Sequence, residues 1–281
     1  MGKDSSVQWC HSSANWQMGC DGCELWSKTI KKCYAGKQTQ GMEGKKGWPL
    51  SFDEPKLFLE RVDPTLKWGP PTDHERDKKP WIPRDYPRII FLNDMGDTFS
   101  RKLPQNWMAP LLPLIAKSAH QYLVLTKRPS ALAAFAEKYP LPENLWPGTT
   151  FTSAPTEARI RELRKIRSGG PKFVSFEPLW SMIPPSAFEG IDWAIFGGES
   201  GEREHKPTPT PVEWIERGTI DAALHGVRRF VKQLGSRPMK DGHPLILRDF
   251  HGGDWNEAEF PTELRIREFP TISMHTQTAL L

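Results

Sequence analysis

Six short apolar segments recur between residues 88 and 232, and they constrain the fold more than any other feature of the chain. They are residues 88–92, 122–126, 148–152, 172–176, 192–196 and 228–232. All are rich in β-branched or aromatic residues, and continuous apolar runs of this length are typical of strands buried on both faces of a parallel sheet. The sequence therefore predicts an α/β protein.

Helical patterns lie between these segments. Residues 129–139 begin with a proline, which suits a first helical position, and continue with helix-favouring alanines. Residues 155–166 carry three apolar side chains on one face and charges elsewhere. Alternating strands and helices predict a full or partial (β/α) barrel of the TIM type, with a doubly wound open sheet as the alternative.

Nearly every predicted strand ends in a polar residue. In a barrel, the residues that follow the strands line the active face. Here these residues are Asn93, Asp94, Asp97, Thr126, Lys127, Arg128, Ser153, Glu177, Glu199 and Lys232.

We select Asp94, Lys127 and Glu177 from this set as candidate catalytic residues. Asp94 suits substrate orientation or proton exchange, and Lys127 suits a carboxylate or phosphate. Glu177 stands at a strand end, where its charge is costly unless it is paired or bound. The alternatives are that Asp97 caps the next helix and that Lys127 forms a salt bridge to Glu177 or Asp94.

The string FGGESG follows the strand predicted at 192–196. Gly197 and Gly198 allow a ligand to approach the backbone, and Glu199 can accept hydrogen bonds from a ribose or an ammonium group. An ordinary tight turn explains the glycines equally well.

Cysteines are clustered near the N-terminus, after a short strand expected at 15–19. Cys20, Cys23 and Cys33 fall within fourteen residues, and Cys10 lies just upstream. Three thiolates can hold three corners of an iron–sulfur cube and leave one iron open, whereas four thiolates can close a zinc site. Both kinds of site remain open on these residues.

Length and composition bound the remaining possibilities. The chain has 281 residues, of which 37% are hydrophobic, enough for one large folded domain over 1–281. Residues 37–87, rich in Trp, Pro and Lys, are expected to form an insertion or flap, and residues 236–281 an irregular tail. The sequence contains neither a membrane-spanning apolar run nor a signal peptide, so we expect no membrane partner and a cytoplasmic location.

Charge and aromatic content permit a polyanionic partner. The net charge is +4, and several of the twelve tryptophans stand beside lysines, as at 45–48, 66–68 and 78–81. Aromatic rings interleaved with cations suit base stacking beside phosphate contacts. Packing of the same rings against the body of the protein is an equal alternative.

Several of these strings occur together in one family. The cysteine segment ending in CYAG, followed by FLNDMGDTF, VLTKRP, SFEPL, DWAIFGGESG, FVKQLG and REFP, resembles an uncharacterised phage and prophage family that is similar to radical S-adenosylmethionine (SAM) enzymes. The resemblance extends from about Trp9 to Pro270. The cysteines depart from the usual spacing of those enzymes, because here they are spaced C-x2-C-x9-C.

The resemblance implies a partial barrel with a 4Fe–4S cluster on Cys20, Cys23 and Cys33, and with SAM on the open iron. One electron passed through the cluster would cleave SAM to a 5′-deoxyadenosyl radical that abstracts hydrogen from a substrate. Gly197, Gly198 and Glu199 would contact SAM. Asp94, Lys127 and Glu177 would line the substrate side.

Our leading hypothesis is a radical SAM enzyme that modifies a nucleobase or its substituent in phage-type DNA, in the cytoplasm of a host cell. Its partners would be DNA or a nucleotide and a reductase or other electron donor. The second hypothesis is a zinc-stabilised nucleic-acid-binding or repair accessory protein. The third is a metal-free hydrolase built on Asp94, Glu177 and Glu199.

Overall fold

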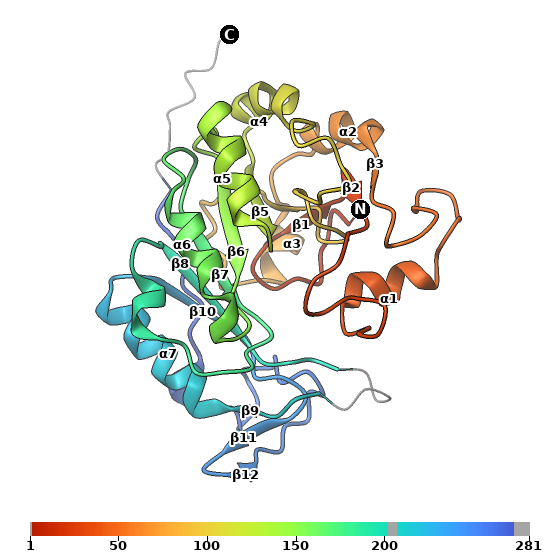
Figure 1. Cartoon of the computed structure of the whole chain (residues 1–281). Coiled ribbons are helices and arrows are strands. Elements are labelled where there is room, and N and C mark those ends of the chain that lie inside the picture. The colour runs from red at the N-terminus through yellow and green to blue at the C-terminus, as the bar shows by residue number, and fades with distance from the viewer. Residues whose placement is uncertain (1, 202–206, 273–281) are drawn as a thin grey trace.

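The computed structural model describes residues 2–201 and 207–272, and its centre is a sheet of seven parallel strands (Figure 1). The strands are β1 (Ser12–Ala14), β4 (Ile89–Leu92), β5 (Gln121–Thr126), β6 (Leu145–Thr150), β7 (Phe173–Phe176), β8 (Trp193–Gly197) and β10 (Arg228–Gln233). They lie in chain order without a reversal, whereas a doubly wound sheet reverses its order at a switch point. Because no pairing joins β1 to β10 in the described residues, the curled sheet is a partial barrel.

All six predicted strands are present. β6 begins three residues earlier than expected and includes Pro147, a residue type that disfavours strand assignment because it lacks an N–H. The strand expected at 15–19 is displaced. Residues 12–14 form β1 instead, and Gln17–Met18 forms β2, which pairs with β3 (Lys56–Leu57) outside the main sheet.

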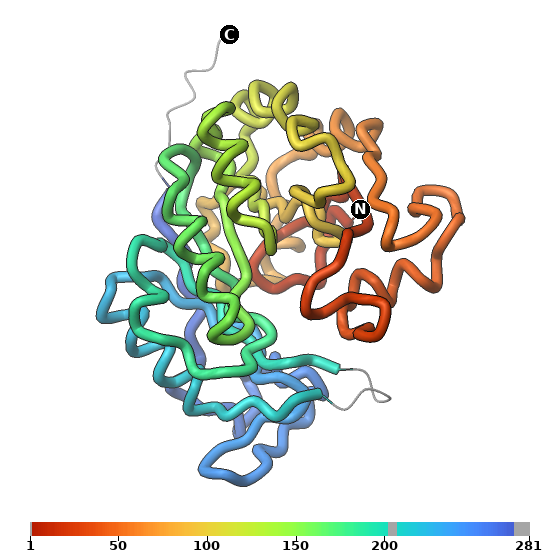
Figure 2. The backbone as a smooth tube through the Cα atoms, viewed as in Figure 1, coloured from red at the N-terminus to blue at the C-terminus, as the bar shows by residue number. Residues whose placement is uncertain are grey.

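Helices cover the outer face of the sheet. They are α4 (Leu112–Lys117), α5 (Pro129–Lys138), α6 (Ala158–Arg164) and α7 (Val212–Leu224). α5 and α6 occupy the predicted positions, whereas the sequence pattern did not reveal α7. The backbone tube in Figure 2 shows α5 to α7 on the left of the view and the N-terminal loop with residues 37–66 on the right.

The inner face of the sheet changes in character along the strands. Near the amino-terminal ends of the strands, which we call the bottom of the partial barrel, this face is filled by aromatic side chains, among them Trp9, Phe91, Phe173, Trp193 and Phe230. Towards the carboxyl ends of the strands the same face carries polar residues. The aromatic layer therefore closes the bottom of the partial barrel and leaves a polar upper end.

Residues 37–87 pack against the body of the protein. The helices of this region are α1 (Tyr34–Gln40), α2 (Val62–Leu66) and α3 (Asp73–Asp77). Residues 56–66 form β3, a 3-10 turn (Leu59–Arg61) and then α2.

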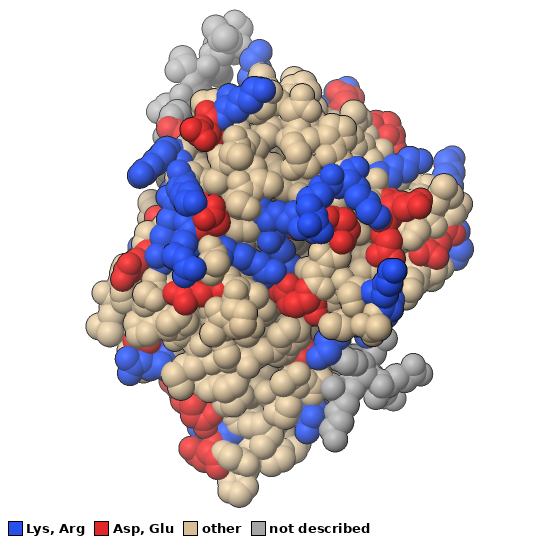
Figure 3. Space-filling view, in the orientation of Figure 1, with Lys and Arg blue, Asp and Glu red and all other residues tan. Residues whose placement is uncertain are grey.

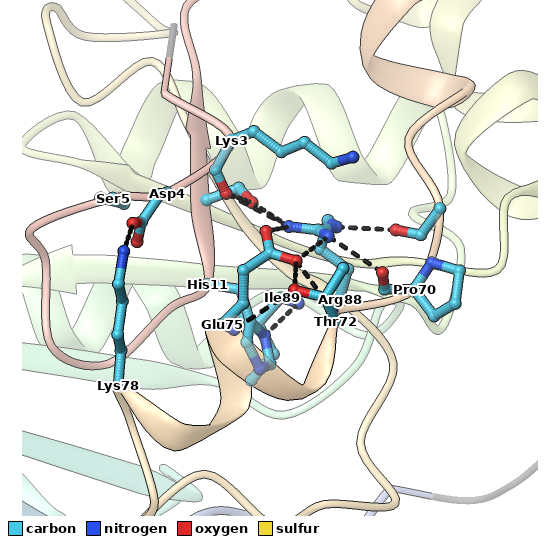
Figure 4. A network of polar contacts seen from close by, with 12 residues as sticks. Lys3, Asp4, Ser5, His11, Pro70, Thr72, Glu75, Lys78, Arg88 and Ile89 are labelled. Carbon is cyan, nitrogen blue, oxygen red and sulfur yellow. Dashed lines mark hydrogen bonds and ion pairs between the residues drawn. The ribbon is translucent and has the colours of Figure 1, made fainter.

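An ion pair holds α3 against the start of β4 (Figure 4). Arg88, fully buried, donates to both carboxylate oxygens of Glu75 at 2.7 and 2.9 Å. The same guanidinium also donates to the backbone carbonyls of Lys3, Gly69 and Pro70 and to the Ser12 hydroxyl. Every N–H of Arg88 is thus used, and one side chain ties three segments together.

Residues after 236 are more regular than the predicted tail. β11 (Pro238–Lys240) pairs with β9 (Thr210–Pro211) and β12 (His243–Pro244), and a 3-10 turn spans Thr262–Leu264. Residues 273–281 of the predicted tail lie outside the described part. None of the described helices has the length and apolar character needed to cross a membrane.

Candidate functional site

The cysteine loop, residues 20–33, lies over the carboxyl ends of the parallel strands. Its first anchor is Asp21, whose buried carboxylate accepts hydrogen bonds from Arg128 at 2.5 Å and Arg101 at 2.8 Å. The Ser100 hydroxyl donates to the same carboxylate at 2.9 Å. Because Arg128 lies two residues after the end of β5, this anchor fixes the start of the loop near the end of that strand.

A second anchor joins the loop to β6 and α6. Arg159 donates to both oxygens of Glu24, at 2.7 and 2.8 Å, and the Thr152 hydroxyl donates at 3.2 Å. The ammonium of Lys127 lies 3.8 Å from the same carboxylate. Burial opposes ionisation of Glu24, but the Arg159 hydrogen bonds and the Lys127 charge outweigh it and lower its pKa to about 2.

The third anchor brings the loop to the Gly-Gly-Glu turn after β8. Lys32, next to Cys33 in the chain, lies 3.1 Å from a carboxylate oxygen of Glu199. Glu199 also accepts from the Trp180 indole at 2.7 Å and from the Thr208 backbone at 3.1 Å. The predicted cysteine and Gly-Gly-Glu motifs are therefore adjacent in space, although Lys32 and Glu199 are 167 positions apart in sequence.

All three cysteines of the loop are free thiols. Burial raises the pKa of each, and that of Cys20 reaches about 12. The Lys127 charge opposes the effect of burial on the pKa of Cys23 and Cys33. In the described ranges, no three His, Cys, Asp or Glu side chains are arranged to hold a single metal ion.

Cys10 does not belong to this group. It is fully buried in the aromatic layer at the bottom of the partial barrel, and burial raises the pKa of its thiol to about 11. Its position removes the fourth ligand that a closed zinc site on Cys10, Cys20, Cys23 and Cys33 would need.

The remaining donor set suits an iron–sulfur cluster. Three soft thiols on one anchored loop are the ligands that such clusters take, and each thiolate binds a different iron. The positive charge of the iron ions in a cluster would stabilise the thiolate form, which offsets the effect of burial on the pKa of these thiols. By donor type, these three cysteines are the ligands that the predicted cluster would use.

Asp94 and Asp97 have different surroundings after β4. Asp97 accepts from the Thr126 hydroxyl at 2.6 Å and the Lys127 backbone at 3.0 Å, so it ties the ends of β4 and β5 together. Burial raises the pKa of Asp94, although a 2.7 Å hydrogen bond from Asn15 opposes that effect. Asp94 is therefore the better placed of the two for proton exchange.

Glu177 follows β7, which is three strands along the sheet from β4. Lys232 donates to Glu177 Oε2 at 2.6 Å. The salt bridge considered for Lys127 with Glu177 or Asp94 is not the one present, because Lys127 pairs with Glu24. The sequence identifies Lys232 only as a strand-end residue, and it does not predict the neighbouring Gln233.

A cleft of about 420 Å³ opens beside the cysteine loop, on its outer side. Cys23 and Trp26 line it together with the cations Lys28, Arg101 and Lys102. The space-filling view in Figure 3 shows Lys and Arg gathered in a band across the middle of this face, between α6 and the region of α1. Asp21 and Asp53 also line the cleft, and Arg101 is paired with Asp21, so the outer approach to the loop carries both kinds of charge.

The tryptophans do not form the exposed stacking surface that the sequence suggested. All twelve are buried or partly buried, including Trp48, Trp68 and Trp81 beside their lysines. Trp81, for example, packs against Trp255 and the guanidinium of Arg267. The packing interpretation is the one the structure supports.

Comparisons with known proteins place the chain in a family without assigning an activity. No curated protein matches significantly. A solved structure of a spore photoproduct lyase mutant superposes with a TM-score of 0.42 at 10% identity, over 74% of this chain and 58% of that one. A likeness at this level carries no conclusion about activity. The model of the family "Protein of unknown function (DUF5131)" matches residues 4–261, and the chain therefore belongs to that family.

Proposed function

We propose that the protein is a radical SAM enzyme that acts on a nucleobase. The observation that carries this proposal is the position of the cysteine loop, which three ion-paired anchors hold over the polar ends of β5, β6 and β8. Open α/β sheets bind ligands beyond the carboxyl ends of their strands. A cysteine loop in that position stands beside polar residues that could hold a small molecule.

Cys20, Cys23 and Cys33 would hold a 4Fe–4S cluster. Such a cluster supplies one-electron cleavage of SAM when it is bound and reduced. Gly197, Gly198 and Glu199 would contact SAM.

The protein's own task is to orient the ligands and to exclude water. Glu199 is buried and held by Lys32 and Trp180, so its carboxylate has a fixed direction. Asp94, Lys127 and Glu177 would face the substrate, with Asp94 positioned to exchange a proton at its carboxylate. The aromatic layer below them closes the bottom of the site, which keeps water away from a reactive species.

The Lys and Arg side chains around the outer cleft support a nucleic-acid substrate, whereas the tryptophans, which are packed against the protein, do not. Lys28, Arg101 and Lys102 around the outer cleft can contact phosphates, while a base would have to leave its stack to reach the strand ends. Cys23 lines the same cleft, so an electron donor would also approach the cluster from this side.

SAM cleavage tests the proposal. The protein is reconstituted anaerobically with iron and sulfide, reduced with dithionite and incubated with SAM, and 5′-deoxyadenosine is quantified by mass spectrometry. We expect product from the wild type and from Cys10→Ala, and none from Cys33→Ala. Absence of product from a fully loaded wild type would overturn the proposal.

A further inference from the structure

A β-bulge at the end of β10 brings two consecutive polar residues to one position of the sheet. From Arg228 to Val231 each residue of β10 pairs with one residue of β8, and the register then shifts so that Gln233 pairs with Gly197. A bulge sets two residues against one and re-aims side chains, often beside functional sites. Lys232 and Gln233 are the two residues affected here.

Gly197 shows which way these side chains point. Trp193 and Ile195 of β8 belong to the inner aromatic layer, so a side chain on Gly197 would also point inward by the alternation of a strand. A Cβ on Gly197 would lie 2.8 Å from Glu177 Oε2 and 2.8 Å from Gln233 Nε2. Both groups therefore stand inside the partial barrel, in space that only a glycine leaves open.

Gln233 has an unused acceptor in this position. Its side chain is buried (5% exposed), and its Nε2 donates to the Gly198 carbonyl at 2.7 Å. Its Oε1 is buried and has no hydrogen-bond partner among the described residues. A buried carbonyl oxygen without a partner is costly, and such groups are rare in native proteins unless a ligand or water meets them.

The neighbours of Gln233 define the chemistry of its partner. Lys232 donates to Glu177 at 2.6 Å, and because an ammonium has three N–H donors, this contact leaves two for a ligand. Glu177 and Gln233 Oε1 are acceptors. The cluster thus offers a donor beside acceptors, which complements a ligand that carries a carbonyl beside an N–H.

We propose that Glu177, Lys232 and Gln233 form a substrate subsite that recognises the lactam edge of a nucleobase. This inference rests on the proposed function, since it names the substrate class of the same site. Uracil, thymine and guanine present a ring N–H next to a carbonyl, whereas cytosine and adenine have no ring N–H on that edge. Gln233 is the specificity-determining residue, because its Oε1 can accept from this ring N–H, whereas cytosine and adenine carry an unprotonated ring nitrogen at the same position.

Binding of single-stranded oligonucleotides tests the subsite. Dye-labelled ten-nucleotide oligodeoxyuridine and oligodeoxycytidine have equal charge and nearly equal shape, and their Kd values are measured by fluorescence anisotropy at one salt concentration. We expect the wild type to prefer oligodeoxyuridine about tenfold, the discrimination typical of a good base contact. Gln233→Met, which keeps the volume and loses the acceptor, should reduce the ratio of the two Kd values to one.

Two further variants make the result decisive. Lys232→Met should also lower the ratio, and it keeps the test valid if Gln233→Met does not fold. Gln121→Met is the matched control, because Gln121 is equally buried but lies at the opposite end of the sheet, where β5 begins. We expect it to retain the wild-type ratio.

The outcomes that would overturn the subsite can be distinguished from those that would overturn the proposed function. Equal Kd values for the wild type, absence of binding to either oligonucleotide, or a preference that survives Gln233→Met would overturn the subsite. Iron content and SAM cleavage are measured on the same preparations. A fully loaded preparation that forms no 5′-deoxyadenosine but still shows the Gln233-dependent preference would refute the radical chemistry and keep the subsite.

Discussion

Replacing Glu75 by glutamine should destabilise the fold in a pH-dependent way. Glu75 is the carboxylate partner of the buried Arg88, and its side chain is 12% exposed. Glutamine keeps the shape and one hydrogen bond, but it leaves the Arg88 charge buried without a counter-charge. Removing one partner of such a pair is costly because the remaining ion cannot be solvated.

The pKa of Glu75 gives the magnitude. Hydrogen bonds from Arg88, opposed by burial, lower this pKa from 4.5 to about 2. A shift of this size corresponds to roughly 3 kcal/mol of stability at pH 7. Because the folded-state pKa is depressed, the contribution is complete above the unfolded value of 4.5 and is lost as the pH falls towards 2. At pH 3 it should be roughly 1 kcal/mol.

Urea unfolding of the wild type and Glu75→Gln at pH 7 and pH 3 measures this difference. The exposed i,i+4 pair of Asp63 and Lys67 supplies the control, because Asp63→Asn should change stability by only a few tenths of a kcal/mol. A Glu75→Gln penalty that is the same at both pH values, or one no larger than that of Asp63→Asn, would refute the reasoning.

Three further predictions concern the site. Lys32→Met should accelerate hydrogen exchange over residues 20–33, because it removes the contact to Glu199, while Lys28→Met on the same loop should not. Gly36→Ala should destabilise the loop by a few kcal/mol, since its Cβ would lie 2.4 Å from the Trp26 ring; thermal unfolding checks this against Gly69→Ala, where the space is open. Gly197→Ala should abolish the oligodeoxyuridine preference in the anisotropy assay, because its methyl group would displace Glu177 and Gln233.

The sheet could be predicted because each strand is a short apolar run that needs no distant partner to be identified. The start of β6 differs from the prediction by three residues because proline, here Pro147, is a residue type that argues against a strand. The elements of residues 37–87 were mostly missed, since they depend on distant contacts such as the one between Glu75 and Arg88.

From the sequence, the candidate site residues could be identified only where they follow predicted strands. Asp94, Lys127, Glu177 and Glu199 follow strands and could therefore be named as candidates from the sequence. The pairing of Lys32 with Glu199 joins residues that no local pattern connects. Gln233 was missed because the bulge that turns it inward depends on the register of β10 against β8, and alternation along the strand would have placed it on the outer face.

The iron and sulfide content of the anaerobically reconstituted protein tests the central claim most directly. The account predicts about four iron and four sulfide ions per chain, with a visible absorption that dithionite bleaches. It predicts that the content is retained in Cys10→Ala and lost when Cys20, Cys23 or Cys33 is replaced by alanine. A colourless protein that holds zinc, or iron that is lost equally in Cys10→Ala, would contradict it.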